Sequence, residues 1–121
     1  MKKRNTLLVT VLFFITAATS FAQTNWNNWA PLDSKDGIDL QYRFGWYESY
    51  DGQKNTELQI KAYNTRNKKV MVNFDKIRFS NGTTDYGGNL LYAHQDSYTF
   101  TFRTKGSVDR FTGDWTVEYY E

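Results

Sequence analysis

The chain has 121 residues, with 15 lysine and arginine residues against 13 aspartate and glutamate residues, and no cysteine. This length fits one domain, and the lack of cysteine excludes disulfide bridges and cysteine–histidine catalysis. The net charge is +2, and three of the basic residues stand at positions 2–4.

Residues 1–22 have the three parts of a secretory signal. Basic residues at positions 2–4 precede an apolar run over 7–18, and small residues stand at positions 20 and 22. The run is shorter than the ~20 residues that a membrane-spanning helix needs. We therefore expect an exported protein, periplasmic or extracellular, with no transmembrane segment after cleavage. An uncleaved anchor is the alternative, and a lipid anchor is excluded because no cysteine follows the run.

Cleavage removes three basic residues and leaves 12 against 13 acidic ones, a net charge of −1. Nucleic-acid binding needs a clustered basic face, so the mature chain gives no case for it. We expect an N-terminal tail over 23–35 and one domain over 36–121. Because so small a domain buries little surface, its stability must come from its many aromatic side chains.

Period-two alternation of apolar and polar residues dominates the mature chain and predicts strands. The predicted strands cover 38–47, 57–64, 69–79, 84–92, 97–104 and 114–121, with a short seventh over 29–34. The fold class that these elements predict is all-β, an antiparallel β-sandwich of six to seven strands. A small β-barrel is the alternative.

The first two strong strands allow a prediction of register. Directly opposed residues share a face of the sheet, so their numbers must add to an even value. A three-residue loop over 50–52, with Gly52 in the left-handed conformation, satisfies this rule. It aligns Phe44 with Leu58, Tyr42 with Ile60 and Leu40 with Ala62. The same parity makes one face of the first strand a core face: Ile38, Leu40, Tyr42, Phe44 and Trp46.

The third strand changes its apolar parity midway, from Val70, Val72 and Phe74 to Ile77 and Phe79. A slip of one residue would turn half of its apolar side chains to the wrong face. A β-bulge near residues 75–76 would correct this, as would a bend between two shorter strands.

Six side chains are candidates for binding. Trp26 and Trp29 precede the first strong strand, and they either plug one end of the sandwich or form an exposed aromatic pair for a sugar or a protein. Gln41, Arg43, Tyr47 and Tyr63 lie on the polar faces of the first two strong strands. Tyrosine on such a face is ordinary strand composition and is also typical of binding surfaces.

Catalysis has little support. His94, the only histidine, lies in a polar turn between two predicted strands, so we expect a surface histidine there and not a general base. Asp33, Asp36 and Asp39 do not match a calcium-binding loop. The interpretation that we prefer is an entry turn with residues 36–37 at its centre. The sequence predicts no cofactor and no metal.

The segments "LQYRF", "LQIKAYN", "VMVNF" and "SYTFTF" resemble the strands of small exported bacterial domains of immunoglobulin-like or fibronectin type. The resemblance implies a non-catalytic module for contact or spacing. Our leading hypothesis is accordingly a non-enzymatic module that contacts a protein or glycan in the cell envelope. A carboxylate-based glycan hydrolase and a structural part of an envelope assembly are the alternatives. For the latter, residues 115–121 are the expected edge for self-association.

Overall fold

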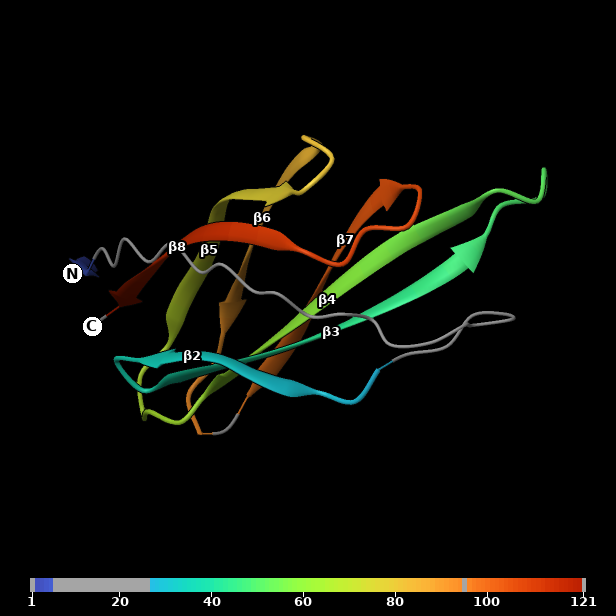
Figure 1. The fold of residues 1–121 in the computed structure, drawn as a ribbon. Helices are drawn as coiled ribbons and strands as arrows, with labels where there is room; N and C mark the ends of the chain where they lie inside the picture. Colours follow the sequence, from blue (N-terminus) through green and yellow to red (C-terminus); the bar gives the residue numbers. More distant parts are fainter. Residues whose placement is uncertain (1, 6–26, 95, 121) are drawn as a thin grey trace.

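The computed structural model describes residues 2–5, 27–94 and 96–120, and of residues 2–5 and 120 the backbone alone. Within these residues the structure is all-β, with eight antiparallel strands and no helix (Figure 1). The strands are β1 (Lys2–Asn5), β2 (Ala30–Lys35), β3 (Ile38–Glu48), β4 (Lys54–Asn64), β5 (Val70–Phe79), β6 (Thr84–Leu91), β7 (Ser97–Lys105) and β8 (Phe111–Tyr120).

The strands form two sheets that enclose one core. The first sheet has the order β2-β3-β4-β7 and is called here the β3 sheet, and the second has the order β1-β8-β5-β6 and is called the β5 sheet. The predicted antiparallel sandwich is confirmed. Its short seventh strand is confirmed as well, as β2.

The immunoglobulin-like strand order is not confirmed. A constant-type immunoglobulin domain places its second and third strands in different sheets. Here β2, β3 and β4 follow one another within one sheet, and after β2 the chain does not change sheet until the connection between β4 and β5.

The predicted register of the β3–β4 hairpin is confirmed, because Phe44, Tyr42 and Leu40 lie opposite Leu58, Ile60 and Ala62. The loop closes as expected, with the Ser49 N–H donating to the Gln53 carbonyl at 2.9 Å and Gly52 at φ 84°. Figure 1 shows this long hairpin reaching to the right beyond the other strands. Its pairing with β2 ends at Tyr42, so the outer part of β3 has no β2 partner.

The predicted bulge in β5 is also present. The register of β5 shifts after Phe74 against both of its neighbours, β6 and β8. The shift restores the apolar parity, so that Phe74, Ile77 and Phe79 are all buried.

The core lies between the sheets and is mostly aromatic and β-branched. Phe74 of the β5 sheet meets Phe100 of the β3 sheet edge to face, with ring centroids 4.8 Å apart. Four residues of the predicted core row of β3 are buried: Ile38, Leu40, Tyr42 and Phe44. Trp46 differs, because it is only partly buried, with the Lys54 ammonium 4.2 Å from its ring centroid. It lies in the outer part of the hairpin, beyond the residues of β3 that pair with β2.

Two boundary expectations change. Residues 30–35, expected as part of the N-terminal tail, form β2 of the sandwich. The last strand, expected at an edge, lies between β5 and β1 and is paired on both sides. The sequence pattern could not indicate this neighbour, because β1 falls within the predicted signal.

No helix in the described part of the chain is long and apolar enough to cross a membrane. The apolar run over 7–18 and the side chain of Trp26 lie outside the described residues.

Candidate functional site

Trp29 lies on the outer face of the β3 sheet, just before β2. The Arg43 guanidinium carbon stands 4.3 Å from the centroid of its ring, and the Lys61 ammonium stands 4.5 Å away. Both cations project from the polar faces of β3 and β4, so Trp29 does not plug the core. A cation this close to an indole face is attracted to it by about 0.5–2 kcal/mol.

Arg43 is held in place from its other side. Its Nε–H donates to Gln59 Oε1 at 2.8 Å, across the register pair that joins the two residues. The guanidinium is therefore fixed before any ligand arrives, and Trp29 packs on a preorganised surface.

A cleft of about 300 Å³ opens beside Trp29 and is lined by Asp39, Gln41, Lys61 and Tyr63. These residues form two adjacent register pairs, Asp39 with Tyr63 and Gln41 with Lys61. Asp39 accepts a hydrogen bond from the Ser34 hydroxyl of β2. The lining of the cleft thus offers an aromatic ring, a carboxylate, an amide and an ammonium group.

We call this surface the Trp29 face and define it as Trp29, Gln41, Arg43, Lys61 and Tyr63. Tyr47 lies farther along the same outer side of β3, with the Arg103 guanidinium 5.4 Å from its ring centroid. Arg103 also donates to Glu57 at 2.5 Å, and this hydrogen bond raises the pKa of the Arg103 guanidinium above its usual value.

The structure places five of the six predicted binding residues on one side of the β3 sheet, and Trp26 lies outside the described residues. Lys61 and Asp39 were not predicted as binding residues. The predicted register already implied both positions, because it sets Lys61 opposite Gln41 and Asp39 opposite Tyr63. The predicted register could not give the position of Trp29, because Trp29 lies outside the paired strands.

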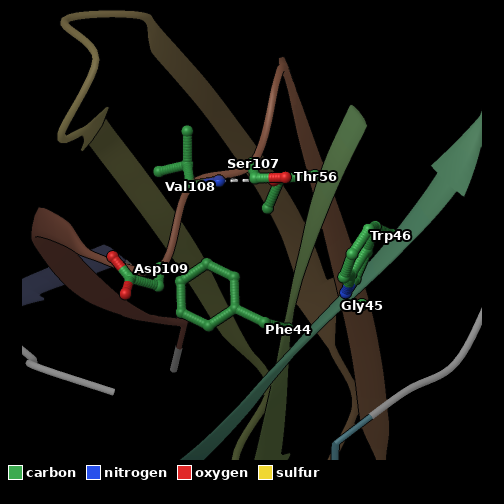
Figure 2. A pocket seen from close by; sticks show the side chains of 7 residues that line it. All are labelled: Phe44, Gly45, Trp46, Thr56, Ser107, Val108 and Asp109. Carbon is green, nitrogen blue, oxygen red and sulfur yellow. Dashed lines mark hydrogen bonds between the residues drawn. The ribbon is translucent and has the colours of Figure 1, made fainter. Parts of the chain in front are cut away.

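A second cavity, of about 290 Å³, lies at the open end of the sandwich (Figure 2). Phe44 and Trp46 of β3 line one side, and Val108 and Asp109 of the β7–β8 loop line the other. The loop is tied to β4 by Thr56, whose Oγ1 accepts from the Val108 N–H at 2.8 Å and donates to the Gly106 carbonyl at 2.6 Å. The cavity is mostly apolar, with one carboxylate at its rim.

A third cavity, of about 490 Å³, lies where the β5–β6 turn meets the start of β8. Its lining includes the aromatic rings of Phe79 and Phe111 and the cationic side chains of Arg78 and Arg110. Arg110 lies 3.7 Å from the Asp109 carboxylate.

The residues weighed for catalysis make structural contacts. Asp36 and Gly37 form the β2–β3 turn, as expected, with φ of 55° and 79°. Asp33 accepts from the Trp115 indole N–H at 3.2 Å. His94 is exposed in the turn between β6 and β7, and its backbone N–H donates to the Arg66 carbonyl at 3.0 Å.

Among the residues with described positions, no three histidine, aspartate or glutamate side chains gather as a metal site would require. Comparison with known proteins adds no relative: no protein-family model matches this chain, and no curated protein matches it significantly.

Proposed function

We propose that this chain is an exported, non-catalytic module that binds a glycan with the Trp29 face of its β3 sheet. The observation that carries the proposal is the position of Trp29, packed against Arg43 and Lys61 at the rim of a polar cleft. The predicted signal over 1–22 supports export to the periplasm or beyond.

The chemistry of the face suits a sugar. A sugar ring has one apolar C–H face, which stacks on an aromatic ring, and a rim of hydroxyl groups that need polar partners. Tyr63 and Trp29 supply aromatic surface, and Asp39, Gln41 and Lys61 supply an acceptor, an amide and a donor. The face carries two cations, Arg43 and Lys61, and the cleft beside it has one carboxylate, Asp39. This balance of charge favours a sugar that carries an acidic group.

Hydrolysis by a carboxylate pair is the less well supported alternative. Such a reaction needs two carboxyl groups on either side of the scissile bond. Each of the three cavities described above is lined by at most one carboxylate. This distribution favours a binding function.

The test uses the exported protein on an array of neutral and acidic glycans, followed by titration calorimetry with the glycans that bind. Trp29→Ala should weaken binding about 10- to 100-fold, as loss of an aromatic anchor does at other interfaces. Trp46→Ala is the matched control, because Trp46 is also partly buried under a lysine but belongs to the inner face of β3. Thermal unfolding confirms that both variants fold.

Two results would overturn the proposal: folded protein that binds no glycan, or equal losses of affinity in the Trp29 and Trp46 variants. Detection of residues 1–22 on the exported protein by mass spectrometry would contradict the predicted cleavage alone.

A further inference from the structure

The edge of β8 that faces away from β5 is occupied by β1. Their register runs from Lys2 opposite Tyr120 to Asn5 opposite Val117. Because β1 lies within the predicted signal, processing after residue 22 would remove the strand and leave that edge of β8 without it.

We propose that in the processed protein this edge of β8 is an acceptor site for an extended, basic segment of a partner protein, which adds to the β5 sheet as an antiparallel strand. The inference rests on the export and cleavage included in the proposed function, and it uses a different surface from the Trp29 face.

β8 lacks three of the features that protect sheet edges: a proline, a lysine and a bulge of its own. Natural edge strands carry proline, lysine or a bulge, which block pairing with other chains. The edge strand β2 has Pro31, a register shift between Pro31 and Asp33, and Lys35 at its end. In contrast, β8 is ten residues long and contains no proline, lysine or arginine. Its sequence is rich in the aromatic and β-branched residues that favour strands.

The folded core also holds β8 extended. Phe111, Trp115, Val117 and Tyr119 are buried along its inner face. On its other side, β8 pairs with β5 from Phe111 to Tyr119. An added strand would therefore meet an ordered edge and would lose only its own conformational freedom.

The charges along β8 favour a basic occupant. In the full chain, Arg4 stands in register with Glu118, and Lys2 lies two positions away on the same strand. Opposite charges at directly opposed positions stabilise a strand pair, and like charges destabilise it. Two copies of β8 could instead pair with each other in antiparallel fashion. If the pairing is centred on residue 116, Glu118 lies opposite Asp114 of the second copy. A centre at residue 117 sets it opposite Thr116, and a centre at residue 118 sets it opposite Glu118. None of these registers supplies a cation, so a basic segment fits better than a second copy.

The experiment uses the exported protein, after mass spectrometry has established its N-terminus, and a synthetic peptide of residues 1–8 as the probe. We expect the peptide to bind, with backbone amide shifts in NMR spectra that concentrate along β8. A control peptide has both Lys3→Pro and Arg4→Pro. Since successive N–H groups of a strand point to opposite sides, this change removes at least one donor to β8 and should abolish binding.

A charge swap tests the register. The Glu118→Arg protein with the natural peptide, and the natural protein with an Arg4→Glu peptide, should each bind up to about fivefold more weakly. The Glu118→Arg protein with the Arg4→Glu peptide should recover that loss. Glycan binding by the Glu118→Arg protein should be unchanged, so failure of the two proposals can be told apart.

Absence of peptide binding by folded, processed protein would overturn the inference. So would a processed protein that forms dimers through β8, because a second copy would then be the occupant. Retention of residues 1–22 on the exported protein would also overturn it, because β1 would still occupy the edge.

Discussion

Asn64, at the end of β4, is fully buried and serves three backbone groups. Its Nδ2 donates to the carbonyls of Lys68 and Tyr92, at 2.8 and 3.0 Å, and its Oδ1 accepts from the Arg66 N–H at 3.0 Å. The amide therefore links the β4–β5 turn to the end of β6. No hydrophobic or charged side chain of the same size offers both donors and an acceptor.

Replacement of Asn64 by Asp should destabilise the fold by about 2–4 kcal/mol near neutral pH. The carboxylate keeps the acceptor but removes both donors and faces two carbonyl oxygens. Urea unfolding followed by tryptophan fluorescence would measure the loss. Asn67→Asp is the control, since Asn67 is exposed in the same turn. Similar stability in the two variants would contradict the assigned role.

Tyr119 makes the fold sensitive to alkaline pH. Burial, together with the nearby Asp36 carboxylate, raises the pKa of its hydroxyl above the ordinary value of 10. Burial raises the pKa of Tyr42 in the same direction. The folded state therefore disfavours tyrosinate, and the stability that these groups contribute is complete below pH 10. It is lost as the pH rises from there through their folded-state pKa values.

We expect the free energy of unfolding to fall between about pH 10 and pH 12, and to fall less steeply in Tyr119→Phe. At neutral pH that variant should lose about 1 kcal/mol, because the Tyr119 hydroxyl donates to the Asp36 carbonyl. Urea titrations at both ends of the range would measure the slope. Tyr50→Phe is the comparison, because Tyr50 is fully exposed at the hairpin tip. An equal slope in the two variants would count against the explanation.

At the scale of elements, the β3–β4 hairpin depends on the conformation of one glycine. Gly52 has φ of 84°, and nothing lies within 4 Å of the place that a β-carbon would take. Gly52→Ala should therefore cost about 1–2 kcal/mol from backbone strain alone, with the register unchanged. Thermal unfolding measures the cost, and Gly52→Asn should cost less because asparagine tolerates this conformation better. A larger loss of stability in the Asn variant would show that the size of the side chain, and not the positive φ, determines the cost of replacing Gly52.

The same hairpin shows how far a sequence pattern reaches. Its register follows from two local facts, the alternation of apolar residues and a glycine in the loop, so it could be predicted residue by residue. The β5 bulge followed in the same way from its parity change. Residues such as Gln41 and Tyr63 could be assigned to one polar face for the same reason.

Features that depend on neighbours distant in the sequence were beyond such patterns. Trp29 lies outside the strands, so no alternation indicates which surface it covers, and only the placed Arg43 and Lys61 explain its position. Trp46 has the parity of a core residue, but it lies in the part of the β3–β4 hairpin that extends beyond the other strands, so it is only partly buried. The pairing of β8 with β1 joins the two ends of the described chain, and no local pattern predicts that.

At the scale of the whole molecule, Thr56 of β4 ties the loop that connects the two sheets, between β7 and β8, to the β3 sheet with two hydrogen bonds. Because its hydroxyl both accepts from Val108 and donates to Gly106, Thr56→Val should cost about 1–3 kcal/mol with little change in volume. It should also speed amide exchange in the β7–β8 loop, measured by NMR. Thr101→Val, on the exposed side of β7, is the control. Unchanged exchange in the loop would contradict this role.

The strand order also governs how this chain can fold. Strand β7 completes the β3 sheet beside β4, although β5 and β6 of the other sheet lie between β4 and β7 in the sequence. Strand β8 pairs with β5 in the β5 sheet, although β7 of the β3 sheet comes before it in the sequence. The hairpins β2–β3, β3–β4 and β5–β6 can form from neighbouring segments, but β4–β7 and β5–β8 must close long loops before their contacts stabilise anything. We therefore expect folding on a millisecond-to-second timescale, in which β7 and β8 join late and both sheets become stable together.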